Sequence, residues 1–192
     1  MVHELAHQWY VAWPSLSQRS LHCSGTTLSP WYEWLYGDEF FVDVEPGYDV
    51  VPRVRGAYSL GDQWRARYGP VALPPSNELF DLFSPNVYDD GAVMLYALRQ
   101  TIGEEAFAEL ERRWAQESAG QSVGTEDFIA LASRVAHRDF GPFLRDRVYG
   151  TTTPPMPGHP DWTVLPADTP LSTAKAAGRG VPRTLERTLR KR

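Results

Sequence analysis

Residues 2–9 read VHELAHQW and contain the pattern His-Glu-x-x-His. On a helix, a step of four residues places His3 and His7 one above the other on the same face. Two neutral imidazoles at that spacing can hold one zinc ion, and the neighbouring carboxylate of Glu4 can take a proton from a zinc-activated water. The stretch therefore predicts a zinc site with His3 and His7 as metal ligands and Glu4 as the general base.

A second segment, residues 86–92, reads NVYDDGA and opens a helical pattern. Together with VHELAHQW it resembles the M1 family of zinc aminopeptidases, whose catalytic domain has a thermolysin-like fold. The resemblance implies that Tyr88, which matches the Tyr of the family's Tyr-x-x-Gly-Ala helix start, donates a hydrogen bond to the oxyanion of the tetrahedral intermediate. A phenol is a suitable donor for that role. The family usually has Lys directly before the Gly, whereas this chain has Asp90.

The third zinc ligand stays open. The family carries it as a helical Glu, with eighteen residues between it and the second His, and the same count leads from His7 to Thr26. A threonine hydroxyl does not replace a carboxylate at zinc. From Glu33 onward the sequence is again similar to that of the family, and the number of residues in between is unchanged. This suggests two compensating frameshifts in the gene. Glu33 lies two helical turns after Thr26 and is one alternative ligand; His22 and Cys23 are the others.

Length and composition indicate one ordinary globular domain. The chain has 192 residues, of which 42% are hydrophobic, enough for a sizeable core. We expect no membrane span, because no run of about 18 apolar residues occurs, and no signal peptide is visible. The single cysteine excludes an internal disulfide and agrees with a reducing compartment, so we expect a cytoplasmic protein. Composition does not predict the oligomeric state.

The second half of the chain has the apolar spacing of consecutive helices. Their predicted starts are Ser84 or Asn86, Glu104, Thr125 and Asp139, and glycines end them. Between Gly37 and Pro85, prolines and glycines predict mostly loops, with a helical turn from Trp64 to Tyr68. We therefore predict a mainly α fold, the helical C-terminal part of a thermolysin-like catalytic domain. Residues 1–150 form a partial M1 peptidase domain in this interpretation.

Residues 151–192 are predicted to be a disordered tail that is rich in proline and basic residues. From Thr163 onward seven Lys or Arg stand against two acids, a charge of +5, so the rest carries −10 of the total of −5. We do not expect nucleic-acid binding, because no aromatic residues alternate with the basic ones near the end of the chain. His137 and His159 match no ligand spacing and are predicted to lie on the surface.

Three functions agree with these patterns. The first is a zinc-dependent metallopeptidase of the aminopeptidase type, which hydrolyses N-terminal bonds of a peptide substrate with a zinc-activated water. The second is a truncated or degenerate M1 homologue with weak or no catalysis, because the third ligand is missing. The third is a helical interaction module whose basic tail binds an acidic partner. Zinc content and turnover distinguish the three.

Overall fold

Helices make up most of the described part of the chain. The computed structural model describes residues 25–41, 47–72, 84–119, 121 and 123–169. The elements are the α-helices α2 (Gly25–Phe41), α3 (Val50–Ser59), α4 (Gly61–Tyr68), α5 (Gly91–Ile102), α6 (Glu104–Glu117), α7 (Thr125–Val135) and α8 (Gly141–Tyr149), together with the π-helical turn η2 (Asn86–Asp90). Within these ranges there is no strand. The predicted mainly α fold is confirmed.

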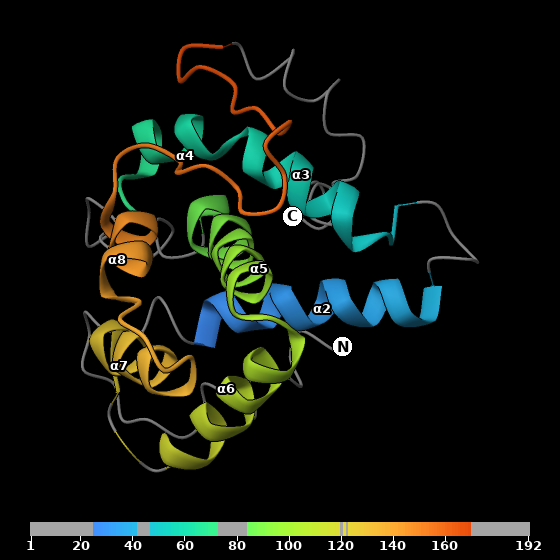
Figure 1. The fold of residues 1–192 in the computed structure, drawn as a ribbon. Helices are drawn as coiled ribbons and strands as arrows, with labels where there is room; N and C mark the ends of the chain where they lie inside the picture. Colours follow the sequence, from blue (N-terminus) through green and yellow to red (C-terminus); the bar gives the residue numbers. More distant parts are fainter. Residues whose placement is uncertain (1–24, 42–46, 73–83, 120, 122, 170–192) are drawn as a thin grey trace, which may run out of the picture.

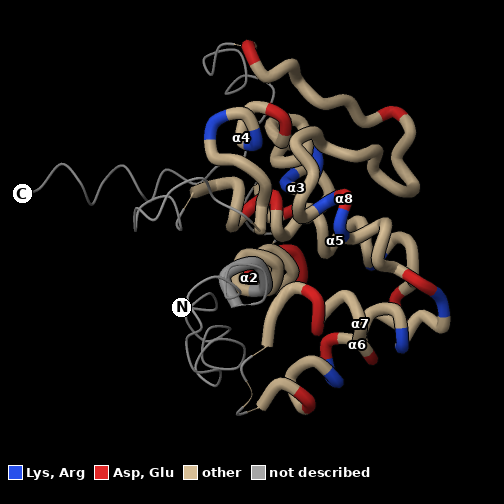
Figure 2. Tube along the Cα trace, turned by 90° about the vertical axis from the view of Figure 1, so that its left-hand side faces the viewer, with Lys and Arg blue, Asp and Glu red and all other residues tan. Residues whose placement is uncertain are grey.

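Helix α5 is the centre of the bundle. Figure 1 shows α3 and α4 on one side of it and α6 and α7 on the other, and Figure 2, which looks roughly along α2, gives the same order. Residues 91–98 of α5 are all buried. A helix that is apolar all round must be enclosed by other elements. Helices α2, α3, α6 and α8 pack against α5 and enclose it.

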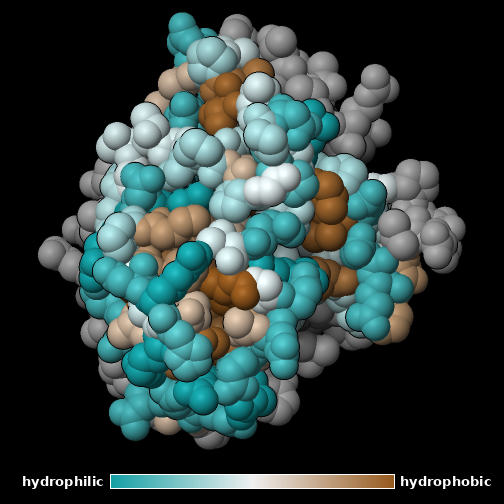
Figure 3. Space-filling view, in the orientation of Figure 1, coloured by the Kyte–Doolittle hydropathy of each residue, from teal (hydrophilic) through white to brown (hydrophobic). Residues whose placement is uncertain are grey.

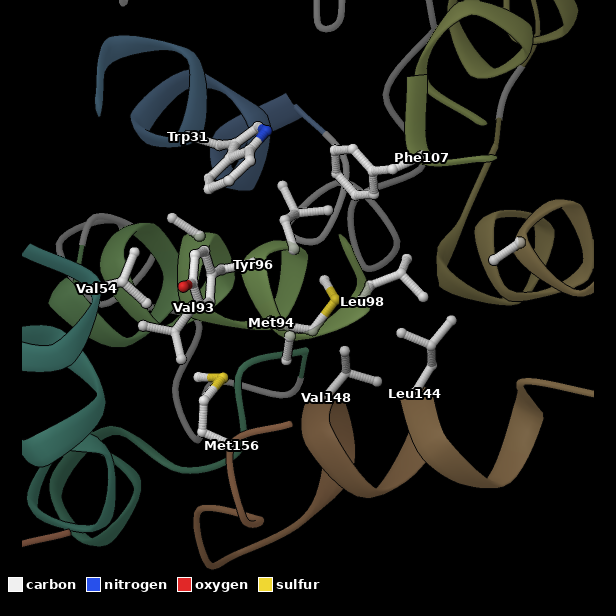
Figure 4. Packing of buried hydrophobic residues seen from close by; sticks show 14 of the residues in the cluster. Trp31, Val54, Val93, Met94, Tyr96, Leu98, Phe107, Leu144, Val148 and Met156 are labelled. Atoms are coloured by element: carbon white, nitrogen blue, oxygen red, sulfur yellow. The ribbon is translucent and has the colours of Figure 1, made fainter. Parts of the chain in front are cut away.

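The core is a single cluster of aliphatic and aromatic side chains that α5 joins to its neighbours. Trp31 of α2 is fully buried and meets the rings of Tyr96 and Phe107 edge to face. Figure 4 shows Trp31 and Phe107 on one side of α5, with Leu144 and Val148 of α8 on the other. Such edge-to-face pairs stabilise a core beyond the area that they bury. The cluster therefore fixes α2 and α8 on opposite sides of α5.

Two helices occupy a region that the sequence predicted as mostly loop. Helix α3 begins after Asp49, whose side chain accepts a hydrogen bond from the Val51 backbone N–H at 3.0 Å. Pro52 falls in the first turn, where a helix does not need the missing N–H. Leu60 ends α3 and directly precedes α4. The prediction of loops was wrong here, because a first-turn proline starts a helix as readily as it breaks one.

The helices of the second half follow the prediction closely. Gly103 ends α5 with a φ of 86°, a left-handed conformation that glycine adopts without strain. Helix α6 buries Phe107, Leu110 and Trp114, the three residues that its spacing predicted. Thr125, predicted as the N-cap, is the first residue of α7, and α8 begins at Gly141, two residues after the predicted cap Asp139.

The described structure continues past Gly150, where the sequence predicted disorder to begin. Residues 151–169 have no helix but lie against the bundle, and both Met156 and Trp162 are buried. The Leu165 backbone N–H donates to the Ser59 carbonyl at 2.8 Å. Prolines exclude a helix here, but they do not prevent apolar side chains from packing. Residues 170–192, with most of the basic charge, lie outside the described residues.

The face of the molecule seen in Figure 3 is mostly polar. Figure 3 shows one face covered largely by hydrophilic residues, with small separate hydrophobic areas between them. No helix among the described residues has the length and apolar character needed to cross a membrane.

Candidate functional site

The predicted site residues fall partly within and partly outside the described structure. His3, Glu4 and His7 lie outside it, as do His22 and Cys23. Their roles stay predictions. Among the residues that the structure does describe, no group of three or more His, Cys, Asp or Glu side chains is placed to hold a metal ion. The part of the candidate site that the structure describes is the region around Tyr88.

Tyr88 is the middle residue of the π-helical turn η2. Its backbone N–H donates to the Ser84 carbonyl at 3.3 Å, and its own carbonyl accepts from the N–H of Gly91, the first residue of α5. The side chain is half-buried. Single π-helical turns are rare and frequently lie at functional sites. The motif match therefore coincides with an irregular piece of backbone.

Helix α4 holds this turn through polar contacts. The Nη2 of Arg65 lies 2.7 Å from the Oδ2 of Asp90, and both side chains are only 2% exposed. The Nδ2 of Asn86, a residue with no exposed surface, donates to the Gly69 carbonyl at 2.7 Å. The first and last residues of the turn are thus both anchored, one on each side of Tyr88.

Asp90 has a structural partner that the sequence did not reveal. The helix dipole is a sufficient reason for an acid in a first turn, but here Asp90 forms a buried ion pair. Burial raises the pKa of its carboxyl to about 6, although the Arg65 guanidinium acts in the opposite direction. The charged form of this carboxyl therefore depends on Arg65 for its compensation.

Helix α2 contacts the other side of the turn and carries Thr26 and Glu33. Thr26 lies in its first turn, and the structure does not describe that side chain. Glu33 is exposed and acts electrostatically on Asp89, whose pKa rises to about 7. Desolvation of the Asp89 carboxyl is the larger cause, and the negative charge of Glu33 adds to it. The residue directly after Tyr88 is therefore a buried carboxyl under the influence of a second carboxyl on α2.

His159 is not the surface residue that the sequence predicted. Its Nε2 lies 2.8 Å from the phenol oxygen of Tyr96, and its ring stacks on Trp162 with centroids 4.0 Å apart. This half-buried stack attaches residues 151–169 to α5. His137, in contrast, is exposed as predicted. Spacing rules test only for metal ligands, so they missed a histidine that serves packing.

Arg65 and Asn86 are the residues of this region that sequence patterns did not single out. Arg65 occurs in a short polar helix, and the acid at helical spacing from it, Asp62, predicts a local pair within that helix and no buried pair with a distant residue. For Asn86, the sequence pattern indicates only a possible helix cap. Their partners, Asp90 and Gly69, become neighbours only through the packing of α4 against η2. The only local sequence signal was an acid where the resembling family has a lysine.

No protein-family model matches the chain. Two curated proteins of Oryza sativa subsp. japonica, aminopeptidase M1-C and aminopeptidase M1-D, are 24% and 23% identical to it over 136 residues. The matched part covers 71% of this chain but only 16% of each relative. The chain therefore corresponds to a small part of these relatives' length.

Solved structures give a matching result. The M1 zinc metallopeptidase from Deinococcus radiodurans superimposes with a TM-score of 0.56 at 26% identity, covering 81% of this chain and 33% of that one. A mutant of an M1 zinc metallopeptidase from Deinococcus radiodurans, solved with a Tyr-Ser-Ala substrate, gives a TM-score of 0.59 at 24% identity. That comparison covers 83% of this chain and 34% of the other. The helical arrangement described above is therefore shared with part of these structures.

Proposed function

The chain is a relative of the M1 zinc metallopeptidases that matches the helical C-terminal part of their catalytic domain, and from this premise we propose that it is a zinc-dependent aminopeptidase. In the proposal, His3 and His7 bind zinc, Glu4 is the general base, and Tyr88 stabilises the oxyanion. The substrate class is a peptide with a free N-terminus. The cytoplasmic location expected from composition is part of the same proposal.

The observation that carries the proposal is the place of Tyr88. It lies in an irregular turn that packs against α2, the helix on which the family resemblance places the third zinc ligand. The turn of Tyr88 and the helix that carries Thr26 and Glu33 are therefore neighbours in the fold. A tyrosine that only filled the core would not need a π-helical turn anchored at both ends.

The available donors fit zinc in type. Imidazoles at a spacing of four suit the ion, and a carboxylate is the usual third ligand in peptidases of this kind. The Thr26 hydroxyl does not serve this purpose, so the third ligand stays open, with Glu33, His22 and Cys23 as the alternatives. Glu33 is on the same helix, and its charge is felt at Asp89, the residue after Tyr88. Zinc, when bound, would polarise the scissile carbonyl and acidify a water.

The side chains of the protein have two separate tasks in this mechanism. The Glu4 carboxylate accepts the proton of the attacking water and returns it to the leaving amine, which is general base and then general acid catalysis. The Tyr88 phenol donates a hydrogen bond to the oxygen that becomes negative when the carbonyl is attacked. Because this bond strengthens in the transition state, it affects kcat more than KM.

Zinc content and turnover of an aminoacyl reporter test the proposal on the full 192-residue chain. We expect one zinc per chain, loss of turnover in Glu4→Gln with zinc retained, and a kcat about 100-fold lower in Tyr88→Phe. Tyr36→Phe is the matched control, because Tyr36 is an exposed tyrosine at the far end of α2. Equal activity of Tyr88→Phe and Tyr36→Phe would contradict the assigned role of Tyr88.

A second candidate is a degenerate homologue with the fold but little catalysis. It is favoured by Thr26 at the position of the family ligand. Weak zinc binding and no turnover would support it, and activity that Glu4→Gln abolishes would exclude it. The interaction-module alternative predicts no specific zinc binding at all.

A further inference from the structure

The turn that carries Tyr88 depends on side chains outside it for its shape. A π-helical turn replaces the regular i→i−4 hydrogen bonds by wider ones, so its backbone is less strongly determined by local bonding than that of an α-helix. In this chain Asn86 and Asp90 are the two ends of the turn, and both are buried and bonded to residues of the α4 segment. Tyr88 lies midway between the two anchors.

Arg65 connects three segments at this point. Its Nη2 meets Asp90 at 2.7 Å, and its Nη1 donates to the carbonyl of Gly150, directly after α8, at 2.8 Å. The contact with Gly150 is a directed hydrogen bond, whereas the contact with Asp90 is a close ion pair whose Oδ2 does not have regular hydrogen-bond geometry. With the guanidinium bonded in two directions, Asp90 has little freedom to rotate, and neither has the turn that ends with it.

We propose that the Arg65–Asp90 ion pair is the positioning device of the turn and sets the direction in which Tyr88 presents its phenol. Asp90 stands at the sequence position where the resembling family has a lysine before its glycine. The importance of this direction for catalysis rests on the proposed function. The positional effect on Tyr88 itself does not, and it can be measured without zinc or substrate.

The alternative is that the pair only stabilises the bundle. A buried ion pair is weak evidence for stability, because the cost of removing two charges from water offsets most of their attraction. Replacing both partners by apolar residues of similar size often leaves stability unchanged, whereas removing one partner leaves an uncompensated charge. A double variant, Arg65→Met with Asp90→Leu, therefore separates positioning from stability, because it removes the ion pair and the Arg65 bond to Gly150 but keeps side chains of similar volume.

The experiment is NMR of the full chain with ring-¹³C tyrosine, without zinc. The Tyr88 signal is assigned by its loss in Tyr88→Phe. In Asp90→Asn and in the double variant, we expect the Tyr88 signal to shift or broaden, while the signals of Tyr36 and Tyr48 stay in place. Far-UV circular dichroism establishes that each variant is folded. If Asp90→Asn unfolds, the double variant decides.

The matched control removes an ion pair of the same chemistry on the surface. Arg145 and Glu126 join α7 to α8 with side chains 52% and 56% exposed, so Glu126→Gln should leave the Tyr88 signal unchanged. A Tyr88 signal that does not move in the folded double variant would overturn the positioning role. If the wild-type chain proves active, the double variant should also lower kcat about tenfold with KM little changed.

The two proposals fail in different ways. An inactive wild-type chain without zinc contradicts the peptidase, but the NMR result still decides whether Arg65 and Asp90 set the direction of Tyr88. An active chain whose Tyr88 signal and kcat are indifferent to the double variant contradicts the positioning role and leaves the peptidase standing.

Discussion

The turn of Tyr88 and the start of α5 are held from two sides by different forces. On the α4 side the contacts are polar, namely the Arg65–Asp90 pair and the Asn86 hydrogen bond to Gly69. On the α2 side the contact with α5 is aromatic, through the fully buried Trp31. Packing stabilises in proportion to buried volume but tolerates small shifts, whereas directed polar bonds fix orientation at little net gain in stability. The comparison suggests that α2 supplies stability and α4 supplies geometry.

The two neighbouring carboxyls of the turn show the same division. Asp90 has a guanidinium partner 2.7 Å away and a pKa of about 6. Asp89 has a pKa of about 7, because the negative charge of Glu33 adds to the effect of burial. Desolvation raises both values, and the nature of the neighbour adds to it or opposes it. Consecutive residues thus differ because they face different helices.

Trp31→Ala should have the largest effect on stability. The change removes a fully buried indole that packs on Tyr96 and Phe107 and donates from Nε1 to Glu111 at 3.2 Å. We expect the free energy of unfolding to fall by about 4 kcal/mol, as measured by urea denaturation. Trp31→Phe keeps a ring in the core and should cost clearly less. Equal losses in the two variants would show that the hydrogen bond, and not the packing, matters on the α2 side.

Asn86→Ala should have the next largest effect. The part-buried Gly69 carbonyl then loses its donor and the side-chain volume of the buried Asn86 is lost as well, so we expect a destabilisation of about 2 kcal/mol. The measurement is again urea denaturation, with hydrogen exchange of the 84–91 amides to locate the change. Asn86→Asp is a useful companion, because its carboxylate would face the carbonyl and should be worse than alanine. A neutral result would remove Asn86 from the anchors of the turn.

Asp89→Asn should stabilise the protein, and only at higher pH. The pKa of Asp89 is raised from 3.8 to about 7, so the folded protein binds the proton more tightly than the unfolded chain does. The contribution to stability is therefore greatest below pH 3.8 and is lost as the pH rises to about 7. At pH 8 we expect the variant to be more stable than the wild type by at least about 1 kcal/mol, the equivalent of one pKa unit.

The pH-dependent part of the difference between Asp89→Asn and wild type should disappear below pH 3.8, where both the folded and the unfolded chain become protonated at this residue. Thermal unfolding at a series of pH values measures it. Glu33→Gln should give a smaller change of the same sign, because Glu33 is the second cause of the shift. A stability difference that grows as the pH falls would have the wrong sign for this explanation.

Phe40→Ser should have the smallest effect. Phe40 is 53% exposed at the end of α2 and stacks on Tyr36, itself 41% exposed, with centroids 4.5 Å apart. Substitutions on an exposed surface usually change stability by less than about 0.5 kcal/mol. The same helix thus contains both the most and the least sensitive of these aromatic positions. A loss comparable to that of Trp31→Ala would mean that this end of α2 is covered in solution.

Local patterns predicted the second half of the fold well. The spacing of Phe107, Leu110 and Trp114 gave the buried face of α6, and Gly103 gave the end of α5. These features depend on neighbours within one or two turns of helix, so a sequence window contains the information. The predictions of a loop around Pro52 and of disorder directly after Gly150 were wrong. In both cases prolines indicated irregular structure, and whether the segment packs depended on distant surfaces.

The candidate site divides in the same way. Tyr88 was found because its motif is local, and the structure adds that its turn is π-helical. Arg65 was not found, because nothing near it in the sequence indicates that it is buried against Asp90. A charged residue has the same appearance in a sequence whether it is solvated or paired in a core. The predicted pair of imidazoles, His3 and His7, is likewise a local pattern and keeps its status as a prediction.

The sequence by itself determined the helices with regular apolar spacing, their glycine ends, and the family resemblance of two short motifs. Each of these depends on hydrogen bonds and side-chain spacing between close neighbours in the chain. Only the tertiary structure decided which carboxyl is paired with Arg65, which faces Glu33, and that His159 joins a buried aromatic stack. Desolvation and charge pairing arise between segments that only folding brings together, and they determine how Tyr88 is held.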